Sequence, residues 1–419
     1  MKSNYSHWLT VVLLAALASP TFGERTTSIL EPKHSGQQTP GGVRLAGDHS
    51  QPSSNDAATH HATGTQQYKL GRYKEALEAF KQSVRLAPNH AESYYYLGMT
   101  YSRLGRYIEA VKAFRSVINL DPKDSAAHAN LGALLAYFGQ YGEALEILNQ
   151  AIRLQPNDAD AYNNLGIAYG ELGRYAQAVA AFKMAIQFEP HSSLAHNNLG
   201  LAYHRMNHNK EAIEPFRQAV RLDPNDYVIH SNLGLAYSAL GQYKEAVEAL
   251  RQAVRLDPSD AESYSNRRWV NIYLAGGEPA ALDAQTYLRL RGWRNARSQY
   301  MVIAAYLGYR QARRNMDASR ILDEAAAQCD TSVWPYPVIR HLRRDLTAQA
   351  LLGLANDSNK VVEAQAYIGI NLALSNRRDD ALPFLRWVRQ NGDQKFIEYR
   401  MAVAELQRLE AVVATPTRR

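Results

Sequence analysis

Cysteine is nearly absent from this sequence, which has one, Cys329, among 419 residues. A single thiol forms no intramolecular disulfide and no cysteine-based zinc site, so a disulfide-stapled scaffold and a zinc finger are excluded. Long hydrophobic runs are absent as well. The longest, residues 8–18, has 11 residues, whereas a membrane-spanning helix needs about 20. We therefore expect no helix that spans a membrane.

Basic and acidic residues balance over most of the chain. Residues 1–260 carry 24 basic and 24 acidic side chains, whereas residues 261–419 carry 23 and 16, so the whole net charge of +7 lies in the C-terminal part. Apolar residues make up 46% of the sequence. That fraction excludes an intrinsically disordered chain and allows a sizeable buried core.

The N-terminus has the pattern of an export signal. Lys2 precedes the apolar run, and Ser19-Pro20-Thr21-Phe22-Gly23 follows it, with small residues three and one before a possible cleavage site after Gly23. This order is typical of a secretory signal peptide, predicted here at residues 1–23. Residues 24–56 are rich in Ser, Thr, Gly, Pro and Gln, which favours a flexible linker. The sequence thus predicts an exported protein, either periplasmic or secreted.

The middle of the chain repeats itself every 34 residues. From about residue 57 to residue 260 the same residue types recur without a gap: Tyr94, Leu97, Gly98, Tyr101, Ala110, Phe114 and Pro122 return as Tyr162, Leu165, Gly166, Tyr169, Ala178, Phe182 and Pro190. Within a unit, small and apolar positions lie three and four apart, which predicts a helix, and a glycine such as Gly173 then ends it. A second helix follows, and Pro190 stops it. Each unit is therefore expected to be an antiparallel helix pair that buries its face only by stacking.

The pattern resembles the tetratricopeptide repeat. The resemblance implies an all-α, right-handed superhelix (solenoid) of antiparallel helix pairs, with six repeats over residues 57–260. A degenerate helical region is expected over residues 261–412, with looser units at 299–332 and 362–395. Between these units, the Trp-Pro-Tyr-Pro sequence at 334–337 is expected to be extended, because a residue before proline disfavours the helical conformation.

Binding residues are predicted on the first helix of each repeat, which lines the concave wall of such a solenoid. The sixth position is asparagine in five successive units: Asn130, Asn164, Asn198, Asn232 and Asn266. An amide both donates and accepts hydrogen bonds, so this ladder suits the backbone of an extended peptide. It resembles the asparagine ladder of O-linked N-acetylglucosamine transferases. The alternative is that the asparagines only link neighbouring helices. A partly apolar groove is predicted beside them, lined by Tyr95, Met99, Asn163, Asn197, Ile167, Leu201, Leu235 and Trp269.

No catalytic motif accompanies the repeats. The sequence has no glycine-rich phosphate loop, no His-Glu-x-x-His and no Gly-x-Ser-x-Gly. We therefore expect a non-enzymatic protein without metal or cofactor. Its expected partners are proteins or peptides, rather than nucleic acid or a membrane.

The C-terminal arginines favour a second interpretation. With Trp269 and Trp293 between them, they could bind an anionic cell-wall polymer or a membrane surface; a solvated helical face is the competing explanation. The set is Arg267, Arg268, Arg289, Arg291, Arg294, Arg297, Arg310, Arg313 and Arg314.

The last part of the chain also carries a more specific pattern. It comprises Trp334-Pro335, Val338-Ile339, Tyr367-x-Gly369, Asp379-Asp380-Ala381 and the segment from Phe396 to Leu406. These residues resemble the C-terminal portion of NlpI-type bacterial envelope tetratricopeptide proteins. The resemblance implies an adaptor that brings peptidoglycan hydrolases to a protease, and it implies a homodimer.

Overall fold

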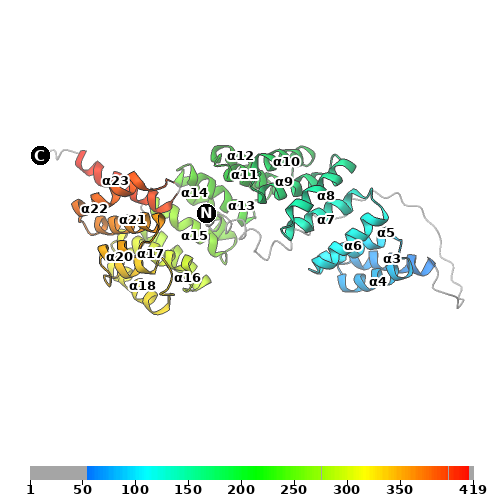
Figure 1. Ribbon diagram of the computed structural model, residues 1–419, viewed down its shortest axis with the longest axis horizontal. Coiled ribbons are helices and arrows are strands. Elements are labelled where there is room, and N and C mark those ends of the chain that lie inside the picture. The colour runs from blue at the N-terminus through cyan, green and yellow to red at the C-terminus, as the bar shows by residue number, and fades with distance from the viewer. Residues whose placement is uncertain (1–53, 275, 395, 415–419) are drawn as a thin grey trace. The chain divides into compact units, whose positions relative to one another are not determined.

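The protein is all-helical wherever its structure is described. The computed structural model describes residues 54–274, 276–394 and 396–414, and within these ranges it contains helices and connecting turns but no strand (Figure 1). The predicted signal peptide, residues 1–23, and residues 24–53 of the predicted linker lie outside them. Among the described helices, none combines the length and the hydropathy that a membrane crossing requires.

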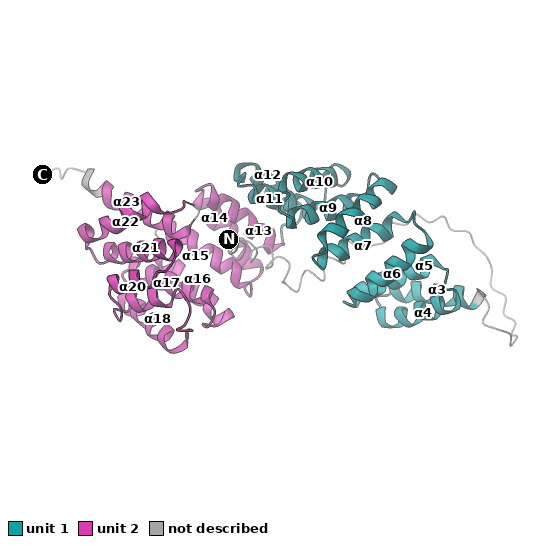
Figure 2. Cartoon of the chain, in the orientation of Figure 1, with its two compact units in different colours: residues 1–224 teal, residues 225–419 magenta. Residues whose placement is uncertain are grey.

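The chain divides into two compact units, residues 1–224 and residues 225–419 (Figure 2). The first unit contains five consecutive helix pairs. They are α3 (Ser54–Lys69) with α4 (Tyr73–Leu86), α5 (Ala91–Arg103) with α6 (Tyr107–Leu120), α7 (Ser125–Tyr137) with α8 (Tyr141–Leu154), α9 (Ala159–Glu171) with α10 (Tyr175–Phe188), and α11 (Ser193–Arg205) with α12 (Asn209–Leu222).

The second unit continues with helix pairs and adds two short helices and a terminal one. Its helices are α13 (Tyr227–Ala239) with α14 (Tyr243–Leu256), α15 (Ala261–Tyr273) with α16 (Gly277–Arg291), α17 (Ala296–Gln311) with α18 (Asn315–Gln328), then α19 (Tyr336–Leu342), α20 (Ala348–Leu354), α21 (Ser358–Leu374) with α22 (Arg378–Asn391), and α23 (Ile397–Ala414). The predicted all-α fold of stacked helix pairs is confirmed.

The pair α9–α10 shows how the sequence forms each repeat. The side chain of Asp158 caps α9 by accepting a hydrogen bond from the backbone N–H of Ala161 at 3.1 Å. Gly173, at φ +72°, then turns the chain in the left-handed region. A side chain cannot replace Gly166 without a clash, because a Cβ there would lie 2.5 Å from the ring of Phe182. The glycine on the first helix is therefore the socket for the aromatic ring of the second.

The second unit departs from this packing at α15. Arg268 stands where the other first helices have glycine, and its side chain is only 2% exposed. Its guanidinium lies 4.2 Å from the centre of the Trp269 ring and donates to the hydroxyl oxygen of Ser265 at 2.9 Å. Beside it, Arg267 forms an ion pair with the buried Asp283 of α16 at 2.5 Å. A polar contact therefore replaces the apolar contact between the two helices.

One prediction about the connection after α18 is wrong. Residues 334–337 were expected to be extended throughout, but α19 begins at Tyr336 and has Pro337 in its first turn. Proline is tolerated at this place because the first N–H groups of a helix have no partner inside it. Only Trp334 and Pro335 precede the helix.

Candidate peptide-binding surface

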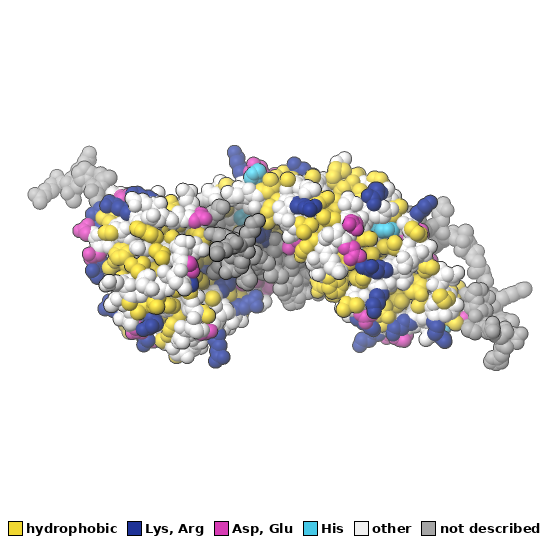
Figure 3. Space-filling view, in the orientation of Figure 1, with side chains coloured by type: hydrophobic (Ala, Val, Ile, Leu, Met, Phe, Trp, Pro, Cys, Tyr) yellow, Lys and Arg dark blue, Asp and Glu magenta, His cyan; other side chains and the backbone are white. Residues whose placement is uncertain are grey.

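The first helices of neighbouring repeats lie side by side in the first unit. Helix α7 contacts α9, and α9 contacts α11, so these helices form one layer. We call the side chains at the fifth, sixth, ninth, twelfth and thirteenth positions of α7, α9 and α11 the inner surface. Figure 3 shows the kind of surface that this unit presents on one of its faces, where broad apolar patches lie among scattered basic side chains.

The asparagines of the ladder are more enclosed than a freely accessible row would be. Asn130, Asn164 and Asn232 are 7%, 4% and 7% exposed, and Asn198 and Asn266 are half-buried. Burial at this level requires a hydrogen-bond partner for each amide, because an unsatisfied buried polar group costs about 1–3 kcal/mol. The partners of these five side chains therefore decide which of them has an amide that a ligand can use.

Three of the amides bond to the preceding repeat. The Nδ2 group of Asn130 donates to the hydroxyl of Tyr95 at 3.2 Å, and that of Asn198 donates to Oδ1 of Asn163 at 3.0 Å. In the second unit, Asn266 donates in the same way to the hydroxyl of Ser231 at 3.3 Å. In each pair, the sixth position of one repeat reaches the fifth position of the repeat before it. We call this contact the inter-repeat staple.

Asn164 has no staple. The residue that would accept its hydrogen bond is Ala129, which has no polar side chain, and the Asn164 side chain forms no hydrogen bond to another residue in the described ranges. Its neighbour Asn163 accepts from Asn198, but the Nδ2 atom of Asn163 is buried and has no partner among the described residues. Helix α9 thus holds two adjacent asparagines, both 4% exposed, with unused hydrogen-bonding groups.

The predicted groove residues divide into two sets. Tyr95 and Met99 are 5% and 0% exposed and belong to the core of the first unit, so the structure places them away from any open surface. Asn163 and Asn197 are also buried. In contrast, the apolar residues at the ninth position stay half-buried, and these are Ile167 and Leu201 in the first unit and Leu235 and Trp269 in the second.

The C-terminal ends of α9 and α11 add charged groups to the inner surface. Burial raises the pKa of Glu171, which accepts a hydrogen bond from the hydroxyl of Tyr141 at 3.5 Å. Burial also lowers the pKa of Arg205, and one guanidinium nitrogen of this residue is buried without a partner in the described part of the chain. Gly170 lies one turn from Ile167, and a Cβ added there would meet no atom within 4 Å. The surface is therefore open at Gly170.

The second unit contains a buried polar cluster that no sequence pattern predicted. The Oε2 atom of Glu363 accepts hydrogen bonds from the Tyr300 hydroxyl at 2.8 Å and from the Trp334 indole at 2.7 Å. Burial and the nearby Glu398 raise the pKa of Glu363 to about 8. Glu398 in turn accepts from the hydroxyl of Tyr367 at 3.0 Å. The residues come from α17, α21, α23 and the segment before α19, so the cluster joins segments that are distant in the sequence.

The C-terminal arginines are mostly engaged inside the second unit. Arg267 pairs with Asp283, and Arg297 pairs with Glu262 at 2.7 Å. Arg310 bonds to Leu374 and Ser375, Arg314 pairs with Glu278 and Asp317, and Arg268 is buried. Arg289, Arg291, Arg294 and Arg313 are exposed and form no ion pair with a described residue. The predicted basic surface is therefore reduced to these four side chains.

The described ranges contain neither a cluster of metal-binding side chains nor an activated thiol. No three His, Cys, Asp or Glu side chains there lie close enough together to hold a metal ion. Burial raises the pKa of Cys329 to about 11, so its thiol stays protonated at neutral pH.

Comparisons with known proteins agree with the helix pairs. The sequence model described as "Tetratricopeptide repeat" matches residues 159–192, 193–226 and 227–260, a second model of that description matches residues 55–123, and one described as "TPR repeat" matches residues 136–173. No curated protein matches the chain.

Several solved structures are similar over part of the chain. MamA from Desulfovibrio magneticus RS-1 is 29% identical, with 41% of this chain and 96% of MamA covered at a TM-score of 0.38. Pseudomonas aeruginosa PilF is 23% identical, with 50% and 95% covered at 0.45. YrrB, described as a TPR protein with an unusual peptide-binding site, is 22% identical, with 43% and 93% covered at 0.38.

The family matches cover the helix pairs from α3 to α6 and from α8 to α14. Residues 55–123 and 136–260 of this chain are therefore tetratricopeptide repeats, the repeat of scaffold proteins that bind protein or peptide partners.

Proposed function

We propose that the protein is an exported, non-enzymatic scaffold that binds an extended segment of a partner protein on the inner surface of α9 and α11. The observation that carries this proposal is the pair Asn163–Asn164. Both side chains are buried, yet Asn163 Nδ2 has no partner and Asn164 has no staple. The amide of Asn164, which has both a donor and an acceptor free of hydrogen bonds to described residues, matches the alternating N–H and C=O groups of an extended backbone, whereas Asn163 Nδ2 is enclosed and reaches a ligand only if its side chain turns outward.

Two neighbouring side chains supply apolar contact beside this pair. Ile167 lies one turn along α9 from Asn163, and Leu201 occupies the same position on α11. Both are half-buried, so the part of each side chain that stays exposed is available to an apolar side chain of the partner. Backbone hydrogen bonds give affinity in this mode of recognition, and alternate side chains of the bound segment give specificity.

The C-terminal ends of α9 and α11 carry two charged groups of opposite sign that interact with each other. Glu171 and Arg205 are partly desolvated, as the directions of their pKa shifts indicate. An opposite charge on the partner would regain part of the lost solvation of each group. Because Glu171 and Arg205 already attract each other, a charged residue of the bound segment adds to the contact but is not required for it.

We base the proposed location and role of this scaffold on residues 1–23 and on the C-terminal pattern. The signal-like residues 1–23 support export to the periplasm or beyond, and the pattern from Trp334 to Leu406 supports an adaptor for cell-envelope hydrolases or proteases that acts as a homodimer. In this role, the partner segment belongs to an enzyme that the scaffold holds, and the scaffold performs no reaction.

Gly170 offers a direct test, because a side chain added there would project into open space and would contact no neighbouring helix. Gly170→Leu adds a large side chain to the inner surface, and Ala180→Leu adds the same side chain at an exposed position of α10. Peptides of 12 residues are selected from a displayed library on the full chain, and their Kd values are measured by fluorescence anisotropy. We expect Gly170→Leu and Asn164→Ala to weaken binding about 10-fold or more, and Ala180→Leu to leave it unchanged.

The same variants separate the two parts of the proposal. Peptides that bind equally well to Gly170→Leu would disprove the inner-surface site. Affinity capture from a cell-envelope extract then tests the adaptor role: hydrolases or proteases retained by Ala180→Leu but lost by Gly170→Leu support it, and capture without such enzymes contradicts it.

A further inference from the structure

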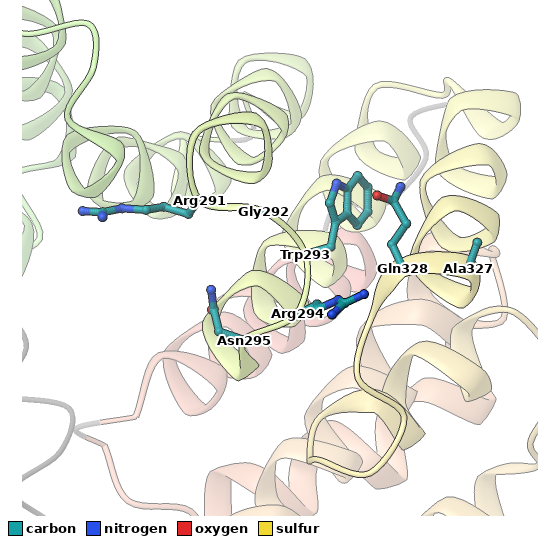
Figure 4. A pocket seen from close by; sticks show the side chains of 7 residues that line it. All are labelled: Arg291, Gly292, Trp293, Arg294, Asn295, Ala327 and Gln328. Carbon is teal, nitrogen blue, oxygen red and sulfur yellow. The ribbon is translucent and has the colours of Figure 1, made fainter.

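A pocket of about 550 Å³ lies in the second unit between the α16–α17 loop and the end of α18. The loop contributes Arg291, Gly292, Trp293, Arg294 and Asn295, and α18 contributes Ala327 and Gln328 (Figure 4). Figure 4 shows Trp293, Arg294 and Gln328 on one side of the loop, with Arg291 extending on the other side. The volume falls within the range of about 300–1,000 Å³ typical of small-molecule sites.

The charge of this pocket is of one sign. Two of its seven lining residues are arginines, and none is acidic. Both guanidinium groups are exposed and lack an ion pair with any described residue, whereas Arg267, Arg297 and Arg314 in the same region are paired. Arg291 extends on the other side of the loop and interacts electrostatically with Glu262, so Arg294 is the guanidinium that lies on the Trp293 side of the loop. An exposed guanidinium without an ion pair to a described residue attracts anions, and carboxylate and phosphate match the planar donors of arginine.

The indole of Trp293 gives the pocket a flat apolar wall. Trp293 is half-buried and packs against the core of the second unit, so its ring is held in place. The loop around it is also fixed, because Asn295 accepts from the backbone N–H of Ser298 at 2.8 Å and the hydroxyl of Ser298 donates to the Gly292 carbonyl at 2.6 Å. A fixed aromatic face stacks against the apolar face of a ring.

We propose that this pocket binds an acidic saccharide, meaning a sugar ring that carries a carboxylate or a phosphate. The sugar ring stacks on Trp293, the acidic group binds Arg294, and the amide of Gln328 bonds to a ring hydroxyl. The amide favours a sugar, because the ring hydroxyls of a sugar offer it partners beside the acidic group, whereas benzoate has no hydroxyl. This site is separate from the inner surface, and its test is independent of peptide binding.

The experiment measures ligand binding to the full chain by calorimetry and by quenching of tryptophan fluorescence. The probes are glucose 6-phosphate and glucuronate as acidic sugars, with glucose, inorganic phosphate and benzoate as comparisons. Arg294→Gln removes the guanidinium on the Trp293 side of the pocket, and Arg313→Gln removes an exposed arginine outside it. We expect both acidic sugars to bind, and the pocket variant to lose about 10-fold or more in affinity.

The comparisons decide the class of ligand. Glucose and phosphate should each bind about 10-fold more weakly than glucose 6-phosphate, and the outside variant should match the wild type within about two-fold. Equal binding of phosphate and glucose 6-phosphate would reduce the site to a general anion site, and tighter binding of benzoate would show an aromatic acid site. Either result overturns the assignment, as does unchanged affinity in the pocket variant.

Discussion

Asn198 donates a hydrogen bond from its side-chain amide to the side-chain oxygen of Asn163, which lies 3.0 Å away on the preceding first helix. The donor is therefore at the sixth position of one repeat, and the acceptor is at the fifth position of the repeat before it. An asparagine ladder that looks uniform in the sequence is therefore divided in the structure, because some of its amides link repeats and one is left for another partner.

Alanine substitutions should separate these two roles. Asn198→Ala removes a staple, and we expect it to lower the free energy of unfolding by about 1 kcal/mol. Asn164→Ala removes no internal hydrogen bond and should change stability by less than about 0.5 kcal/mol while weakening peptide binding. Urea unfolding followed by circular dichroism measures both effects. Equal destabilisation by the two variants would show that Asn164 also has a structural partner.

Ala129→Ser should supply the missing staple. A serine hydroxyl at this position stands where Ser231 stands relative to Asn266, so it can accept from Asn164. We expect the free energy of unfolding to rise by about 0.5–1 kcal/mol and the affinity for a peptide to fall, since Asn164 is then engaged. The control is Ala133→Ser, one turn further along α7, which offers Asn164 no acceptor. It should change neither the free energy of unfolding nor the affinity for the peptide. A variant that gains stability without losing affinity would contradict the role of Asn164 in binding.

Two glycines of α9 should respond to alanine with opposite signs. A Cβ at Gly166 would lie 2.5 Å from Phe182, whereas a Cβ at Gly170 would meet nothing within 4 Å. Gly166→Ala should therefore destabilise the protein by about 1–3 kcal/mol, because the ring must move. Gly170→Ala should stabilise it by up to about 1 kcal/mol, because alanine favours a helix over glycine. Thermal unfolding of the two variants checks this difference, and a gain of Tm in Gly166→Ala would refute the packing account.

The buried carboxyl of Glu363 should make stability fall as pH rises. Its pKa is raised to about 8 in the folded protein, from the ordinary glutamate value of 4.5. Between these values the folded chain binds a proton that the unfolded chain releases, so the free energy of unfolding decreases with increasing pH. Glu363→Gln keeps an acceptor for Tyr300 and Trp334 but does not ionise. We expect it to be more stable than the wild type at pH 9, by on the order of 3 kcal/mol, and similar at pH 4.5.

Urea titrations at pH 4.5, 7 and 9 measure this difference. Glu245→Gln is the control, since Glu245 is an exposed residue of α14 in the same unit. Its stability should follow the wild type at every pH. A constant difference between wild type and Glu363→Gln across the range would show that Glu363 ionises normally in the folded state.

The 34-residue period predicts the helices well, because the contacts that form each helix pair lie within one repeat. The socket at Gly166, the turn at Gly173 and the cap at Asp158 all act within one unit of 34 residues. The environment of a ladder residue depends instead on the unit before it. Tyr95, Ala129 and Asn163 occupy the same position in three successive units, and only their chemistry decides whether the next asparagine is stapled.

Exposure could not be predicted in the same way. Met99 and Ile167 share the ninth position of their helices, yet Met99 is fully enclosed and Ile167 is half-buried. Met99 belongs to the large core cluster of the first repeats, which contains several aromatic rings, whereas Ile167 packs at the edge of a cluster of four buried residues. The Glu363 cluster was beyond prediction for a different reason. Tyr300 lies 63 residues from Glu363, in a region without a period, so no sequence rule brings them together.

The inter-repeat staple also determines what happens to the asparagines when unequal recombination adds or removes one repeat. Its donor and acceptor are always 35 residues apart, so excision or duplication of a 34-residue segment leaves every asparagine beside the fifth position of the repeat that now precedes it. Excision of residues 125–158 would bring Tyr95 next to Asn164 and give this asparagine a hydroxyl acceptor. Gain or loss of one repeat can therefore engage an asparagine amide in a staple, or free it for a ligand, without any point substitution.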